Sequence, residues 1–311
     1  MTELKKCIIA TRESPLALWQ AKHVQALLSE RYPQTTVELL GMTTKGDKIL
    51  DVTLSKIGGK GLFVKELEAA MLANQADLAV HSLKDVPMEL PEQFELAAVT
   101  DREDPRDCFV SPKYESLESM LAGAKVGTSS LRRELMLRIR FPHLVVESIR
   151  GNVGTRLSKL DRGDYDGLVM ATAGLKRLGL GDRIREIIPA ELSLPSPGQG
   201  ALGIETRKGD KAVVELVHFL NDQNTRWCCT AERAVSKALG GSCQVPLAAY
   251  ATIEDGEMRL RTLVGDNKTG TYVEAEVRGK PEAALDIAAE AVKILREKGA
   301  DAILKEVLCR A

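Results

Sequence analysis

Hydrophobic residues in the first two thirds of the chain form short apolar runs separated by segments with helical spacing. The runs that predict strands cover residues 7–10, 37–42, 77–81, 108–110, 125–128, 145–149 and 167–171. Helical spacing is seen, for example, at Leu67, Ala70 and Met71. Ser14 followed by Pro15 is a typical helix start. This strand–helix alternation predicts an α/β fold with mostly parallel, doubly wound sheets.

Two stretches rich in turn-forming residues interrupt the alternation, at residues 104–107 and 194–200. Clusters of proline and glycine between regular segments are typical of loops, so we interpret both stretches as passages between domains. The predicted domains are residues 1–104 together with 198–220, residues 105–197, and residues 221–311.

The third domain has a different pattern, which predicts a small α+β unit. We expect a helix at residues 225–239, strands at 248–253, 258–264 and 271–277, and a helix at 281–298. The turn Glu254-Asp255-Gly256 between the first two strands is typical of a hairpin. The apolar face expected on the last helix consists of Leu285, Ala288, Val292 and Leu295.

Composition and charge narrow the possible functions. The 311 residues are 44% hydrophobic and 28% charged, which is typical of a globular protein. The formal net charge of -1 provides no global field for nucleic acid or anionic membranes, so we expect neither as a partner. The first apolar run is too short for a signal peptide, and no segment reaches the roughly 18 apolar residues of a membrane span. We therefore expect a cytoplasmic protein.

The six cysteines are scattered, without a C-x-x-C pair or a Cys/His cluster, so we predict neither a disulfide framework nor a metal site. Five are expected to be small buried residues: Cys7, Cys108, Cys228, Cys229 and Cys309. Cys243 is different, because it follows Gly240 and Gly241 and precedes Pro246. This predicts an exposed loop, on which a thiol is an accessible nucleophile. A histidine base is not close in sequence, so a cysteine protease is poorly supported.

Basic residues follow the predicted strands, beside Ser, Thr or Gly at several expected helix starts. Ligands of open α/β sheets bind beyond the carboxyl ends of the strands, and free helix N–H groups there favour anions. The basic residues are Arg12, Lys84, Arg132, Arg133, Arg150, Arg156 and Arg177. They predict a polyanionic ligand carrying carboxylates or phosphates. Arg138 and Arg140 instead continue a helix pattern and are expected on its exposed face.

Asp85 is the acidic residue that we place among these basic strand ends. One interpretation is that it caps a helix beginning near Val86 and Pro87. The other is that its carboxylate accepts hydrogen bonds from N–H groups and stabilises a cationic intermediate.

Residues 58–61, Gly-Gly-Lys-Gly, lack the spacing of a nucleotide-binding phosphate loop. We expect a mobile loop that brings Lys56, Lys60 and Phe63 over the site. A two-lobed anion-binding module, either a solute receptor or a ligand-sensing domain, explains the lobes and basic turns but not Cys243. A phosphate-ester enzyme lacks its acidic metal-binding cluster.

The chain resembles the porphobilinogen deaminase family along essentially its whole length. The similar segments are residues 10–20, 56–66, 81–87, 102–107, 127–133, 150–159 and 197–205. Residues 232–246 resemble the family's cofactor-attachment signature, with Ser242 at a position where glycine is also familiar. Beyond about Ile253 the resemblance is less distinctive.

The resemblance implies two lobes similar to periplasmic binding proteins and a small C-terminal α+β domain. It implies a transferase of haem biosynthesis, expected to be a monomer. A dipyrromethane cofactor would be held by a thioether on Cys243, and four porphobilinogen molecules would be added to it with loss of ammonia before hydroxymethylbilane is released. Asp85 would then stabilise the pyrrole nitrogens and their developing positive charge, and the basic residues would bind carboxylates. Further contacts are expected from Ser14, Ser82, Thr128, Ser130, Gly151 and Gln199.

Overall fold

The computed structural model describes residues 4–44, 64–240 and 245–310. They form two compact units, each described by itself. Unit 1 contains the described residues up to 103 and Gly200–Arg226, and unit 2 contains Asp104–Gln199 and the described residues from 227 onwards. Within these ranges, none of the helices combines the length and apolar character needed to cross a membrane.

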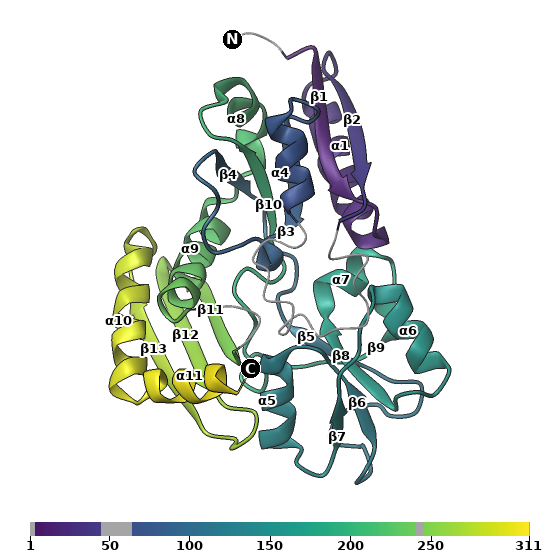
Figure 1. Ribbon diagram of the computed structural model, residues 1–311, viewed down its shortest axis with the longest axis vertical. Coiled ribbons are helices and arrows are strands. Elements are labelled where there is room, and N and C mark those ends of the chain that lie inside the picture. Colours follow the sequence, from purple (N-terminus) through teal and green to yellow (C-terminus); the bar gives the residue numbers. More distant parts are fainter. Residues whose placement is uncertain (1–3, 45–63, 241–244, 311) are drawn as a thin grey trace. The chain divides into compact units, whose positions relative to one another are not determined.

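Unit 1 is built on one five-stranded sheet. Its strands are β1 (Lys6–Arg12), β2 (Thr36–Met42), β3 (Leu78–Ser82), β4 (Phe94–Val99) and β10 (Leu202–Arg207), in the order β2-β1-β3-β10-β4 (Figure 1). The accompanying helices include α1 (Pro15–Arg31), α4 (Lys65–Leu72) and α8 (Lys211–Val217). Alternate residues of β1 point to opposite faces: Ile9 packs in the same cluster as Leu28 of α1, and Ala10 packs with Leu67 of α4. The sheet is therefore covered on both faces.

Unit 2 repeats this strand order in its first part. The strands are β5 (Asp107–Val110), β6 (Lys125–Gly127), β7 (Val145–Glu147), β8 (Gly167–Ala171) and β9 (Ile184–Ile187), in the order β7-β6-β8-β5-β9. The helices that follow the parallel strands are α5 (Leu131–Arg140), α6 (Val153–Asp161) and α7 (Thr172–Arg177). Phe109 packs with Leu137 of α5, whereas Cys108 packs with Leu157 of α6, so this sheet also has two covered faces.

One antiparallel strand occupies the same position in each sheet. The chain enters unit 2 at Asp104 and leaves it at Gln199, and the first strands after these two passages are β5 and β10. Each is antiparallel to both of its neighbours. Its amino end therefore lies at the carboxyl edge of the parallel strands: Asp107 pairs with Ala171 in unit 2, and Leu202 pairs with Ser82 in unit 1.

The C-terminal part of unit 2 is an antiparallel sheet covered by helices. Its strands β11 (Leu247–Glu254), β12 (Glu257–Gly265) and β13 (Tyr272–Gly279) follow one another in space as in sequence. Helices α10 (Ala284–Glu297) and α11 (Ala300–Cys309) belong to this region, as does α9 (Gln223–Ala238) from Trp227 onwards (Figure 1). The expected hairpin is confirmed: Asp255 and Gly256 both have positive φ, as a two-residue turn of this kind requires.

Most of the expected elements are present, and three details were wrong. Leu285 is 63% exposed, and α10 instead buries Ile287 and Ala291 beside Ala288, Val292 and Leu295. Cys309 is exposed near the chain's end, while Cys7, Cys108, Cys228 and Cys229 are buried as expected. Arg138 and Arg140 are exposed on α5, as expected. No helix begins at Val86, because the chain is extended there after a short 3-10 turn at Leu83–Asp85.

Candidate active site

The first turn of α5 positions two arginines at the carboxyl edge of the unit 2 sheet. The side chain of Ser130 caps the helix by accepting a hydrogen bond from the backbone N–H of Arg133 at 3.5 Å. Thr128 supports this turn, because its Oγ1 accepts a hydrogen bond from the Ser130 N–H at 3.3 Å. The cap fixes where the helix starts, and so places Arg132 and Arg133 directly beyond β6.

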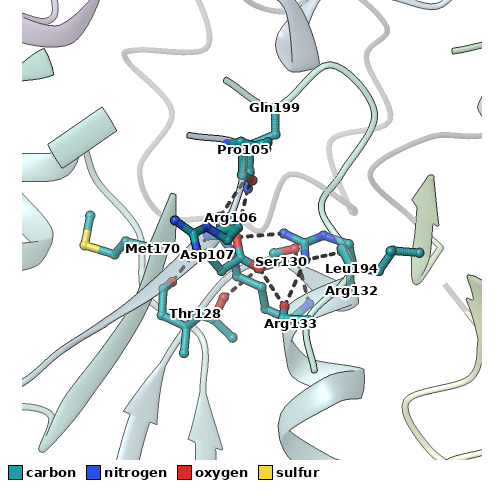
Figure 2. Close-up of polar contacts among 12 residues, drawn as sticks. Pro105, Arg106, Asp107, Thr128, Ser130, Arg132, Arg133, Met170, Leu194 and Gln199 are labelled. Carbon is teal, nitrogen blue, oxygen red and sulfur yellow. Dashed lines mark hydrogen bonds and ion pairs between the residues drawn. The ribbon is translucent and has the colours of Figure 1, made fainter. Parts of the chain in front are cut away.

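Both guanidinium groups close on Asp107, the first residue of β5 (Figure 2). Arg132 donates from Nη1 to Oδ2 at 2.7 Å and from Nη2 to Oδ1 at 3.1 Å. Arg133 donates from Nε to Oδ1 at 3.0 Å. Asp107 is fully buried, and each arginine is 6% exposed. One carboxylate therefore orients two cations at the edge of the sheet.

Polar groups from the returning chain complete this cluster. Gln199 donates from Nε2 to Asp107 Oδ1 at 3.0 Å and to the Pro105 carbonyl at 2.6 Å, and its Oε1 accepts from Arg133. Ser193 donates its hydroxyl to Asp107 Oδ2 at 2.7 Å. The two segments that lead into and out of unit 2 are thus tied to the same carboxylate.

The charges of this cluster explain why Asp107 is ionised. Burial by itself would raise the pKa of Asp107, but the neighbouring charges of Arg132 and Arg133 and the hydrogen bonds of Arg132 and Gln199 lower it well below its usual range. With one negative and two positive groups, the cluster carries an excess of one positive charge. Such an excess favours an anion at this edge of the sheet.

Asp107 is a site residue that the sequence interpretation missed. It was expected in a passage between domains, and Asp85 was placed as the acid among the basic strand ends. The antiparallel direction of β5 brings the amino end of that strand to the same edge, opposite Ala171 at the end of β8. The residues Asp-Pro-Arg-Asp were visible at 104–107 in the sequence, but the direction of the strand that follows them was not.

The turn after β7 carries a second group of predicted residues. Gly151 has a φ of 115°, and a Cβ there would lie 2.6 Å from Thr155, so this position requires glycine. Asn152 caps α6, and Arg156 in its first turns donates from Nε to the Gly151 carbonyl at 2.8 Å. Arg150 lies just before this turn and is half-buried. Gly151 and the capping residue Asn152 therefore form the turn that begins α6.

Arg177 has a different position from the one expected. It is the last residue of α7, which begins directly after β8, so it lies at the carboxyl end of this helix and not in the strand-to-helix turn. Its neighbour Lys176 forms an ion pair with Asp104 at 3.6 Å.

Unit 1 gathers another set of predicted residues at its own sheet edge. Arg12 ends β1 and Ser82 ends the adjacent β3. Ser14 caps α1, accepting from the Ala17 N–H at 3.4 Å. The buried Gln20 donates from Nε2 to the Ser82 hydroxyl at 2.8 Å. The same edge therefore presents a cation, two hydroxyl groups and a helix N-terminus.

Lys84 and Asp85 lie in the 3-10 turn that follows β3. Asp85 is exposed and is the last residue of this turn, so the helix-capping interpretation is wrong. The exposure leaves the Asp85 carboxylate accessible. Cys243, Lys56, Lys60 and Phe63 lie outside the described residues. In the part of the chain that is described, no group of three or more His, Cys, Asp or Glu side chains is arranged to hold a metal ion.

Known proteins match this chain over nearly its whole length. The family model "Porphobilinogen deaminase, dipyromethane cofactor binding domain" matches residues 7–215, and "Porphobilinogen deaminase, C-terminal domain" matches residues 226–298. A porphobilinogen deaminase of Bordetella parapertussis is 58% identical over 308 residues, covering 99% of this chain and 98% of the relative. One from Nitrosomonas europaea is 55% identical over 304 residues, covering 98% and 99%.

Among solved structures, the methionine-binding protein MetQ matches with a TM-score of 0.46 and 13% identity, covering 76% of this chain and 96% of that one. The periplasmic aliphatic sulphonate binding protein SsuA from Escherichia coli matches with a TM-score of 0.41 and 14% identity, covering 77% of this chain and 72% of that one. The sequence matches span both the lobes and the C-terminal region at more than half identity. This chain therefore belongs to the porphobilinogen deaminase family, with the dipyrromethane cofactor-binding domain of that family.

Proposed function

We propose that this chain joins four porphobilinogen molecules, with loss of ammonia, on a dipyrromethane primer attached to Cys243, and then releases hydroxymethylbilane. The observation that carries this proposal is the family match, which extends through the cofactor-binding domain at residues 7–215 and into the C-terminal domain at residues 226–298. The reaction belongs to tetrapyrrole biosynthesis.

The donor chemistry of the two sheet edges fits such a cofactor. Pyrroles of this kind carry acetate and propionate groups, so a growing chain of them presents many carboxylates. Arginines and helix N-termini are suitable partners for carboxylates. The residues that would bind the carboxylates of cofactor and substrate are Arg12, Lys84, Arg132, Arg133, Arg150 and Arg156 at the sheet edges. Arg177, at the carboxyl end of α7, is assigned the same role on the family resemblance alone. The cofactor supplies the free pyrrole carbon at which the chain is extended.

Asp85 has the surroundings that its proposed role requires. Its carboxylate is exposed, next to Lys84 in the turn beyond β3 and at the same sheet edge as Arg12. We assign it to accept hydrogen bonds from the pyrrole N–H of porphobilinogen and to offset the positive charge that develops as ammonia leaves. Contacts to the same ligands are assigned to Ser14, Ser82, Thr128, Ser130, Gly151 and Gln199.

The domain boundaries remain part of this proposal. We assign residues 1–104 with 198–220 to the first domain, 105–197 to the second and 221–311 to the third. The separate family match at residues 226–298 and the separate three-stranded sheet support a third domain. We also propose that the protein acts as a monomer in the cytoplasm, without nucleic acid, and that Lys56, Lys60 and Phe63 belong to a loop over the site.

The covalent primer gives the most direct test. We expect the intact mass of the purified protein to exceed the sequence mass by two linked pyrrole units, and peptide mapping to place the adduct on Cys243. Cys243→Ser should have the unmodified mass and no turnover. Cys309→Ser is the matched control, since Cys309 is an exposed cysteine that the proposal does not use. A fully active wild-type protein without any added mass would refute the proposal.

A further inference from the structure

A cavity lies within unit 2, between α5 and the three-stranded sheet. Its volume is about 440 Å³, which is in the range of small-molecule sites. Five residues of α5 line one wall at helical spacing: Arg132, Leu135, Met136, Ile139 and Arg140. The remaining walls are formed by the loop that contains Ser193, by residues of β11, β12 and β13, and by Lys298 at the end of α10.

The lining combines an apolar body with charged groups. Leu135, Met136 and Ile139 face the cavity from α5, and Leu263 and Ala275 line it from the sheet. This surface suits an apolar group, because burying apolar area is favourable wherever water is displaced.

The charged groups around the cavity are mostly neutralised, but cations remain. Arg261 is paired with Glu191 at 2.9 Å, and Glu276 is paired with Arg259 at 2.7 Å. Among the described residues, neither Arg140 nor Lys298 has an ion pair with an acidic side chain; Lys298 donates to the Glu274 backbone carbonyl. Glu274 is the remaining acid in the lining. Arg140 and Lys298 together carry two positive charges against the one negative charge of Glu274, so the cavity favours a ligand with one negative group.

Arg132 connects this cavity with the cluster around Asp107. Its two Nη atoms are engaged by Asp107, and Nη1 also donates to Ser193 Oγ at 3.2 Å and to the Leu194 carbonyl at 2.8 Å. Its Nε is buried and has no hydrogen-bond partner in the described part of the chain. Ser193 and Leu194 line the cavity as well. An occupant of the cavity would thus touch the residues that hold Arg132 in place.

We propose that this cavity is a binding site for a small carboxylic acid with an apolar aromatic body. The carboxylate is held by Arg140 and Lys298, and the aromatic body lies against Leu135, Met136 and Leu263. A ligand in the cavity contacts Ser193, Leu194 and Arg132, and its binding therefore changes how Arg132 and Arg133 are held at the sheet edge. The binding itself is independent of the proposed function; only its effect on the reaction rests on the role assigned to Arg132.

Dansylglycine, a fluorescent aromatic molecule with one carboxylate, is a suitable probe. Titrated into the holoenzyme, it should give a saturable rise in fluorescence at one site per chain. Arg140→Glu should weaken its binding by about tenfold, because it replaces a charge-assisted contact with repulsion. Arg138→Glu is the matched control, with the same charge change on the same helix but outside the cavity, and should bind as the wild type does.

A second variant tests the cavity's volume. Leu263→Trp fills it and should abolish saturable binding, with circular dichroism reporting the fold of each variant. If Leu263→Trp does not fold, Arg140→Glu decides alone, because Arg140 is an exposed residue. Non-saturable binding, or equal affinity in wild type and Arg140→Glu, would overturn the site. Displacement of the bound probe by porphobilinogen alone, at unchanged affinity in Arg140→Glu, would place it in the active site and likewise overturn the proposal.

Discussion

Two aspartates at the sheet edges have opposite surroundings. Asp107 is fully buried and satisfied by two arginines, a glutamine and a serine, whereas Asp85 is exposed in a short turn beside Lys84. A carboxylate that is saturated by protein groups positions them, and one that is accessible can act on a ligand. We therefore expect substitutions of the two residues to affect different properties of the protein.

Replacing Asp107 should reduce stability. Asp107→Asn keeps the shape of the side chain but leaves Arg132 and Arg133 buried without a counter-charge. Breaking a buried ion pair costs roughly 3–5 kcal/mol of stability. Denaturant unfolding should show this loss in the free energy of unfolding. Asp164→Asn is the control, since Asp164 pairs with Arg162 on the surface, where a pair contributes about 0–1 kcal/mol. Equal losses in both variants would contradict the assigned role of Asp107.

Replacing Asp85 should instead reduce the rate. Asp85→Asn removes the charge that offsets the developing cation, and we expect single-turnover rates to fall by about 10²–10³-fold. Asp85→Glu keeps the charge on a longer arm and should retain more activity than Asp85→Asn. Thermal melts of both variants should match the wild type, because Asp85 caps no helix. A folded Asp85→Asn enzyme with wild-type chemistry would remove Asp85 from the mechanism.

At the scale of elements, α4 is attached to the unit 1 sheet through a buried acidic cluster. Glu68 of α4 is 8% exposed and faces Glu205 of β10, His81 of β3 and Lys65 of its own helix. His81 Nε2 lies 2.8 Å from Glu205 Oε2. Burial and the Glu205 charge raise the pKa of Glu68, with opposing contributions from His81 and Lys65. The folded state therefore holds this proton more tightly than the unfolded chain does.

This cluster predicts a pH dependence of stability. Above the ordinary Glu pKa of 4.5 the unfolded chain releases a proton that the folded chain keeps, so the Glu68 contribution to stability falls as the pH rises from that value through the raised pKa. Glu68→Gln mimics the protonated side chain and should gain stability relative to wild type as the pH rises. The measurement is the free energy of unfolding at several pH values. Glu215→Gln, at an exposed site on α8, is the control and should show no such trend. A stability difference between Glu68→Gln and wild type that does not change with pH would contradict the role assigned to this cluster.

The sequence predicted elements best where a local pattern decides them. Strand β8 was placed at its observed bounds, and the Ser14–Pro15 start of α1 and the Asp255–Gly256 hairpin were correct because capping and turn chemistry are local. Strands β4, β9 and β10 and helix α11 were not predicted. β10 is one of the central strands of its sheet, and nothing in its own residues reveals that its partners are β3 and β4.

The site was predictable in its residue types but not in its pairings. The sequence placed basic residues beyond the parallel strands, and Arg12 and Arg132 do lie at the carboxyl edges of the two sheets, while their role in binding a ligand stays a prediction. Their partners come from segments distant in sequence: Asp107 lies 25 residues before Arg132, and Gln199 lies 66 after Arg133. Such contacts depend on strand direction, which hydrophobic periodicity does not specify. The same limit explains why Arg177 was placed in a turn when it lies at the far end of α7.

At the scale of the whole molecule, the order of strands in space differs from their order of synthesis. All five strands of the first sheet in unit 2 lie between residues 107 and 187, without interruption by another unit. The unit 1 sheet begins with β1 but has β10 inserted between β3 and β4, and among the described strands β4 pairs with β10 alone. The unit 1 sheet therefore cannot be completed until β10, the last of its strands to be synthesised, has been made.

The insertion of β10 thus has a consequence for folding: the second lobe is expected to mature before the first. Closing the long loop between β3 and β10 costs conformational entropy, and pairing between distant segments is slow. In pulse-labelling hydrogen exchange during refolding, backbone amides of β6 and β8 should gain protection before those of β3 and β4. Simultaneous protection of the two sheets would refute this order. A nascent chain released before residue 202 would have a complete second sheet but a first sheet without its bridging strand β10. Chaperones would therefore bind such a chain at its amino-terminal half.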